Sequence, residues 1–194
     1  MKLTKLPQLL VVLRFGIAPL LLTDALDGRT TIWFILGYII AFFSDIFDGI
    51  IARRLGVSTV GLRQADSIAD VCLYISIAIC VWLVHPEIII DFKTPLLIAI
   101  AAQLILYAIS LIKFRKPPSF HTYTAKAWGI SLFIATIGIF GFNWGNGLWL
   151  AIAFCLINTI EEIAMTLILP EWHHDILSIF HAWELKKHQR SISS

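Results

Sequence analysis

Four aspartates lie near the ends of two strongly apolar segments of the sequence: Asp45, Asp48, Asp66 and Asp70. If both segments are helical, the first two share one face of one helix, and the last two lie one turn apart on one face of the next. Because residues 55–65 form only a short link, we expect the two helices to be neighbours and the carboxylates to meet. Carboxylates held so close to one another and to hydrocarbon are costly unless cations bind them.

These residue types predict a metal site for a phosphorylated ligand. Oxygen ligands favour Mg²⁺, Mn²⁺ or Ca²⁺ over zinc, and four carboxylates are enough for two ions. A pair of such ions can bind a diphosphate during a transfer reaction. Gly49 and Ala52 lie on the same helix face as Asp45 and Asp48, and such small side chains leave room for a ligand to approach the backbone.

The elements that position the aspartates are predicted to be membrane helices. Of the 194 residues, 58% are hydrophobic and only 14% are charged, which is too apolar for an ordinary soluble domain. No alternating strand pattern competes, so we expect an all-α integral membrane bundle. Six apolar runs are close to the length that crosses a bilayer: 7–23, 31–52, 67–84, 95–112, 127–142 and 147–169.

Basic residues predict the orientation of the bundle. If the amino terminus faces the cytoplasm, twelve Lys and Arg residues fall on the cytoplasmic side and two, Arg29 and Lys93, fall outside, while Arg14 lies within the first span. This positive-inside bias places the aspartate-rich link at the cytoplasmic boundary. The net charge of +2 is less informative than this asymmetry, and we expect no nucleic-acid partner.

The sequence after Pro170 predicts an amphipathic helix. Large apolar residues recur there at helical spacing: Trp172, Ile176, Phe180 and Trp183. Such a helix lies on the cytoplasmic leaflet or packs on the protein's own cytoplasmic face, and the pattern serves either arrangement. We therefore expect a six-helix transmembrane catalytic domain over residues 1–170 and an amphipathic C-terminal segment over 171–194.

The aspartate motif resembles a family signature. Asp45-x2-Asp48-Gly49-x2-Ala52-Arg53, followed by Asp66-x3-Asp70, matches seven of the eight fixed positions of D-x2-D-G-x2-A-R-x8-G-x3-D-x3-D, the pattern of the CDP-alcohol phosphatidyltransferases. The remaining glycine position is Leu62 here, with Gly61 one place earlier. Near the amino terminus, Pro7 and Arg14 keep the ends of the family's Pro-Asn-x-Leu-Thr-x-x-Arg pattern.

The resemblance implies an activity and a location. The expected enzyme transfers a phosphatidyl or substituted phosphoryl group from a CDP-linked lipid donor, such as CDP-diacylglycerol, to an alcohol and releases CMP. Its active site would face the cytoplasm, most naturally from a bacterial inner membrane, and the protein would be able to form a homodimer. The four aspartates would hold two divalent cations, Mg²⁺ or Mn²⁺, and Asp70 would also be the general base.

The resemblance also implies ligand-binding residues. CDP would be bound by Asp45, Gly49, Ala52, Arg53 and Asp66. The acceptor or a lipid phosphate would be bound by Arg14, Arg115, Lys126 and Glu161. For Arg14, pairing with an acidic residue inside the bundle is an alternative. Lys126 and the other basic residues could instead be interfacial anchors, and Glu161 could be a polar packing contact.

The acceptor itself is less well defined than the reaction. The basic segment around Arg115 and Lys126 favours a phosphorylated acceptor such as glycerol 3-phosphate. Serine, inositol or its phosphate and other alcohols are alternatives within the same reaction class. A small cation-binding transporter is the alternative outside it, although all four aspartates cluster at one end of their spans and outline no path across the membrane.

Overall fold

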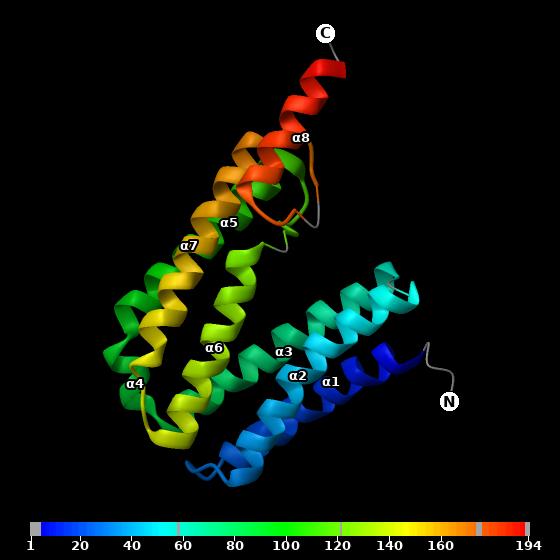
Figure 1. The fold of residues 1–194 in the computed structure, drawn as a ribbon. Helices are drawn as coiled ribbons and strands as arrows, with labels where there is room; N and C mark the ends of the chain where they lie inside the picture. The colour runs from blue at the N-terminus through cyan, green and yellow to red at the C-terminus, as the bar shows by residue number, and fades with distance from the viewer. Residues whose placement is uncertain (1–4, 58, 121, 174–175, 193–194) are drawn as a thin grey trace. The chain divides into compact units, whose positions relative to one another are not determined.

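The computed structural model describes residues 5–57, 59–120, 122–173 and 176–192, and the described residues form helices with no strand. The chain divides into two compact units, Met1–Ile90 with Ile139–Asn143, and Asp91–Gly138 with Trp144–Ser194. Their helices follow one another along the chain as coloured in Figure 1: α1 (Leu6–Ala25), α2 (Ile32–Leu55), α3 (Val60–Val84), α4 (Pro86–Asp91), α5 (Lys93–Phe114), α6 (Tyr123–Phe142), α7 (Gly147–Ile168) and α8 (Ile179–Ile192).

Six of the described helices are long and apolar enough to cross a membrane, and they coincide with the six expected spans. Large apolar side chains point outward from them; Ile112 is 84% exposed and Trp33 is 73% exposed. Exposed apolar surface on this scale requires a hydrocarbon environment rather than water. The chain is therefore an integral membrane protein with an all-α fold.

In the first unit, α1 packs along both α2 and α3 (Figure 1). A Cβ added at Gly37 of α2 would lie 3.1 Å from Leu21 of α1, which reflects the close approach of these two helices. The aspartate-bearing helices α2 and α3 make fewer close backbone contacts with each other than either makes with α1. Most of the packing that relates these two helices is therefore supplied by α1.

The link between α2 and α3 is fixed by caps at both ends. Gly56 ends α2 in the left-handed conformation with φ of 64°, which a glycine adopts without strain. Its amide donates to the Arg53 carbonyl, and the Val57 amide donates to the Ala52 carbonyl at 3.0 Å, as in a Schellman motif. The Thr59 hydroxyl then caps α3 by accepting from the Leu62 amide at 3.2 Å.

The departure from the family signature falls in the first turn of α3. Gly61 and Leu62 are both helical there. A Cβ added at Gly61 would meet no atom within 4 Å. The protein's own packing therefore does not require a glycine at this position.

In the second unit, polar side chains tie α5 to α7. The Gln103 amide donates to the Thr159 hydroxyl at 2.9 Å. Lys113, in the last turn of α5, donates at 2.9 Å to the carbonyls of Thr166 and Leu167. These carbonyls lie at the end of α7, where backbone acceptors lack helical partners and a cation is favourable.

The C-terminal helix begins later than the sequence spacing suggested. It starts at Ile179, so Trp172 and Ile176 precede it and the helical pattern drawn through them was wrong. Ile176 instead packs in a buried apolar cluster with Phe120, Met165, Leu169 and Ala182. The tail is thus packed on its own unit, while Phe180 (78% exposed) and Trp183 (53% exposed) face outward from α8.

Glu161 of α7 anchors the start of α8. One carboxylate oxygen accepts from the Ile179 amide at 3.0 Å, and the other accepts from the Thr124 hydroxyl. A carboxylate at a helix amino terminus is favoured because it satisfies a free amide and faces the positive end of the helix dipole. Glu161 therefore joins the tail helix to α6 and α7.

Replacing Glu161 with alanine should loosen α8. Loss of a charge-assisted hydrogen bond typically costs about 1.5–3 kcal/mol, so amide exchange at the start of α8 should accelerate about tenfold or more. Hydrogen–deuterium exchange in detergent measures this directly. Glu184→Gln, a charge-matched change on the exposed side of α8, is the control, and an unchanged exchange rate at Ile179 in Glu161→Ala would contradict the anchoring role.

Candidate functional site

The carboxylate cluster (Asp45, Asp48, Asp66 and Asp70) forms in the first unit as the sequence spacing predicts. Asp45 and Asp48 come from the second half of α2, and Asp66 and Asp70 come from the first half of α3. Asp48 is almost fully buried, with 5% of its side chain exposed, whereas Asp66 and Asp70 are each 32% exposed. The cluster therefore has a buried side and a side that a ligand can reach.

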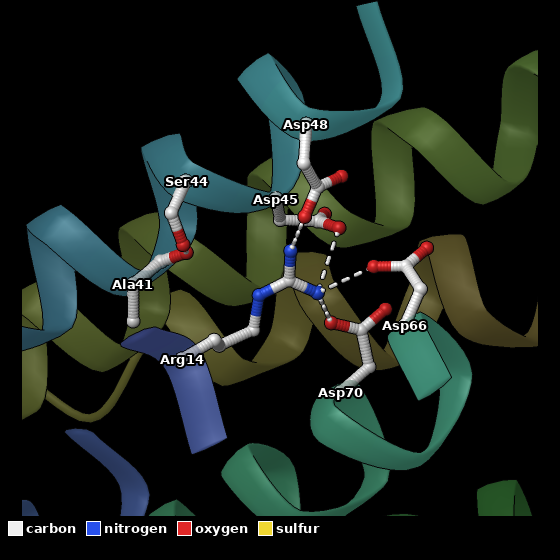
Figure 2. A network of polar contacts seen from close by, with 7 residues as sticks. All are labelled: Arg14, Ala41, Ser44, Asp45, Asp48, Asp66 and Asp70. Atoms are coloured by element: carbon white, nitrogen blue, oxygen red, sulfur yellow. Dashed lines mark hydrogen bonds and ion pairs between the residues drawn. The ribbon is translucent and has the colours of Figure 1, made fainter. Parts of the chain in front are cut away.

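Arg14 of α1 lies in the middle of this cluster (Figure 2). Its Nη1 atom is 3.0 Å from an Asp45 oxygen and 3.0 Å from an Asp66 oxygen, and it also contacts Asp70. Its Nη2 atom contacts Asp48. The Arg14 side chain is fully buried, so the guanidinium is a fixed cation surrounded by carboxylates from two other helices.

Two roles were expected for Arg14, a phosphate ligand or a partner for acidic residues in the bundle. The structure shows the pairing with acidic residues, and the phosphate role stays a prediction. The charges do not balance, however, because one guanidinium faces four carboxylates. With all four ionised, the cluster keeps a strong excess of negative charge, which favours the binding of a further cation.

The carboxylate oxygens fit a divalent metal ion. One oxygen from each of Asp45, Asp48 and Asp66 lies within 4.8 Å of the other two. An oxygen-only ligand set with partial exposure is typical of sites for Mg²⁺, Mn²⁺ or Ca²⁺, which retain water or bind substrate phosphate. The guanidinium among these oxygens is itself evidence that the cluster accommodates positive charge.

The residues expected to bind CDP lie on the adjoining part of α2. Arg53 folds back by one turn, so that a Cβ added at Gly49 would lie 3.5 Å from its Nη1 atom. Ala52 is buried with 6% exposure, and Arg53 is exposed. A small side chain and an exposed guanidinium thus lie near Asp48, where a phosphorylated ligand would approach the helix.

The other expected acceptor residues belong to the second unit. Arg115 follows the end of α5 with φ of 55°, and the Lys126 ammonium lies 5.3 Å from the centre of the Tyr123 ring. Both side chains are exposed. Glu161 anchors α8, as described above, so both of its oxygens already have partners.

The second unit also contains a set of hydrogen-bonded polar side chains around Asn158, a residue that the sequence analysis did not single out. The Thr122 hydroxyl donates to the Asn158 side-chain oxygen at 2.7 Å, and the Thr124 hydroxyl, which donates to Glu161, lies 3.0 Å from the same oxygen. The Asn158 amide donates to Glu162 at 3.2 Å. Asn158 is a polar residue inside an apolar span that also contains Glu161 and Glu162. Its polarity in that position could have identified it from the sequence.

Comparison with known proteins bears on the whole arrangement. The family model described as CDP-alcohol phosphatidyltransferase matches residues 4–172, which includes all six spans and the carboxylate cluster. No curated protein and no solved structure gives a significant match. The match covers most of the chain and agrees with the signature read from its aspartates, so the chain belongs to the CDP-alcohol phosphatidyltransferase family.

Proposed function

We propose that this protein transfers a phosphatidyl group from a CDP-diacylglycerol-like lipid to a small alcohol and releases CMP, as a step of phospholipid synthesis. Family membership supports the general reaction, transfer from a CDP-alcohol to an alcohol. One observation carries the proposal for this chain: four carboxylates from two membrane helices converge at one buried cationic centre. An apolar bundle with such a centre suits a donor that is itself a lipid.

The proposed cofactors are two divalent cations, Mg²⁺ or Mn²⁺, bound by Asp45, Asp48, Asp66 and Asp70. When bound, such ions supply charge stabilisation for the donor's diphosphate and for the departing CMP. The spacing of the oxygens supports this assignment for Asp45, Asp48 and Asp66. The partial exposure of Asp66 and Asp70 supports the access of substrate phosphates to the same cluster.

Asp70 is the proposed general base. It would accept the proton of the acceptor hydroxyl while the hydroxyl oxygen bonds to the phosphorus of the phosphatidyl group. The bond from that phosphorus to the bridging oxygen breaks, and CMP leaves with the electron pair. The partial exposure of Asp70 supports this role, because a base must come within hydrogen-bonding distance of the hydroxyl.

The remaining assignments concern binding. Gly49, Ala52 and Arg53, with Asp45 and Asp66, are proposed to bind the cytidine diphosphate. Glycerol 3-phosphate is the proposed acceptor, because Arg115 and Lys126 are exposed cations suited to a phosphate. Serine, inositol or its phosphate and other alcohols are the competing acceptors.

Orientation follows from the basic residues of the sequence. We propose that the carboxylate cluster faces the cytoplasm, as in a bacterial inner membrane, because the connections on that side carry most of the Lys and Arg residues. A soluble acceptor would then enter from the cytoplasm, while the donor stays in the bilayer. The homodimer implied by the family resemblance stays a prediction.

The reaction itself can be tested with purified protein. CDP-diacylglycerol, Mn²⁺ or Mg²⁺ and one acceptor at a time should give metal-dependent CMP release, fastest with glycerol 3-phosphate. The measurement is CMP formation over time in detergent or nanodiscs. Release with serine or inositol alone would replace the acceptor assignment, and absence of CMP with every acceptor would exclude the transferase reaction.

Asp70→Asn should reduce turnover by about 10²- to 10⁴-fold, the usual contribution of a general base. The amide keeps the shape of the side chain but cannot take the proton. Turnover is compared with that of Asp91→Asn, which removes an exposed aspartate at the end of α4 and should stay as active as the parent. An Asp70→Asn protein with full turnover would remove the base assignment.

Gly49→Ala should separate stability from activity. Alanine is a better helix former than glycine by about 1 kcal/mol, and its Cβ would meet only the movable end of Arg53 at 3.5 Å, so thermal stability should hold or rise. If CDP approaches the backbone here, the KM for donor should rise about tenfold or more. Gly129→Ala, whose Cβ would meet nothing within 4 Å, is the matched control. Equal donor KM in both variants would argue against a ligand contact at Gly49.

A further inference from the structure

The Arg14 guanidinium contacts carboxylate oxygens of the same aspartates that would ligate a metal ion. Its two Nη atoms contact one oxygen from each of the four aspartates, including Asp66 Oδ1 at 3.0 Å. Figure 2 shows the guanidinium between the two helices, with the aspartates directed at it from several sides. A divalent cation ligated by these oxygens and a guanidinium hydrogen-bonded to them would overlap in space and repel in charge.

The Arg14 side chain has charged partners at both Nη atoms but none at Nε among the described residues. The side chain is fully buried, and its Nε atom has no hydrogen-bond partner among the described residues. A buried donor without a partner is unfavourable, so the present position of the guanidinium leaves one donor unsatisfied. Withdrawal of the guanidinium from the aspartates requires a rotamer change of this long side chain, while α1 stays packed on α2 and α3.

We propose that Arg14 is an internal competitor for the metal site: its guanidinium neutralises the carboxylate cluster when no divalent cation is bound and must leave those oxygens when one binds. This inference rests on the proposed metal site and adds a role for Arg14 that differs from phosphate binding. Arg14 then sets how tightly the protein holds metal. It also keeps the four aspartates together in the metal-free protein, where they would otherwise repel one another.

The competition predicts opposite effects on metal affinity and on metal-free stability. In Arg14→Gln, the dissociation constant for Mn²⁺, measured without nucleotide by electron paramagnetic resonance or calorimetry, should fall by about 5- to 150-fold, the usual range for coupled sites. The melting temperature without metal should fall, and saturating Mn²⁺ should raise it by more than in the parent protein. Arg14→Lys keeps the charge but has only one donor group and should bind Mn²⁺ with intermediate affinity.

Two controls separate local competition from general effects. Arg54→Gln removes an exposed positive charge from the end of α2 and should leave the Mn²⁺ affinity within about twofold of the parent, because exposed charges are screened. In Arg14→Ala, prepared in the presence of Mn²⁺ to preserve folding, added methylguanidinium should weaken Mn²⁺ binding by refilling the vacated space. Methylguanidinium should not weaken Mn²⁺ binding to the parent protein.

The outcomes distinguish this inference from the proposed function. If the parent and Arg14→Gln bind Mn²⁺ with equal affinity, or if the variant binds more weakly, Arg14 is not a competitor, although the metal site stands. If neither protein binds Mn²⁺ and the parent releases no CMP, the metal site fails and this inference fails with it. Tighter binding in Arg14→Gln with competition by methylguanidinium in Arg14→Ala would establish the role.

Discussion

The contact of one buried guanidinium with four carboxylates is the interaction on which the first unit depends. Arg14 is a point at which α1, α2 and α3 meet through charged groups. Removing one partner from a buried ion pair commonly costs about 3–5 kcal/mol, because the other charge is left without compensation. In this protein the loss of Arg14 would leave four carboxylates without their shared partner, and they would also repel one another.

The two units differ in how their charged groups are paired. In the second unit, Lys113 donates to helix-end carbonyls, and Glu161 accepts from a hydroxyl and an amide. Those groups have partners of matching kind, so they stabilise the packing of α5, α7 and α8. The carboxylate cluster instead keeps excess negative charge beside an exposed face. Uncompensated negative charge destabilises packing but favours the binding of a cation. For this reason we assign the chemistry to the first unit.

Much of this arrangement could be predicted from the sequence because it depends on local periodicity. Hydropathy alone located six spans, and the spacing of Asp45, Asp48, Asp66 and Asp70 placed them on two helix faces. The partners of Arg14 could be anticipated only as a class, since they come from helices 31 to 56 residues away in the chain. The start of α8 was missed because Trp172 and Ile176 have helical spacing, yet Ile176 lies in a non-helical segment and packs in a buried apolar cluster.

The central claim is that divalent cations bind between the aspartates in place of the Arg14 guanidinium. A crystal of the protein grown with Mn²⁺, with diffraction recorded near the manganese absorption edge, tests this most directly. The account predicts anomalous peaks among the oxygens of Asp45, Asp48 and Asp66, at distances of about 2.0–2.4 Å, with the guanidinium withdrawn. An active protein whose Mn²⁺-soaked crystals show Arg14 still contacting all four aspartates, with no anomalous peak among them, would contradict it.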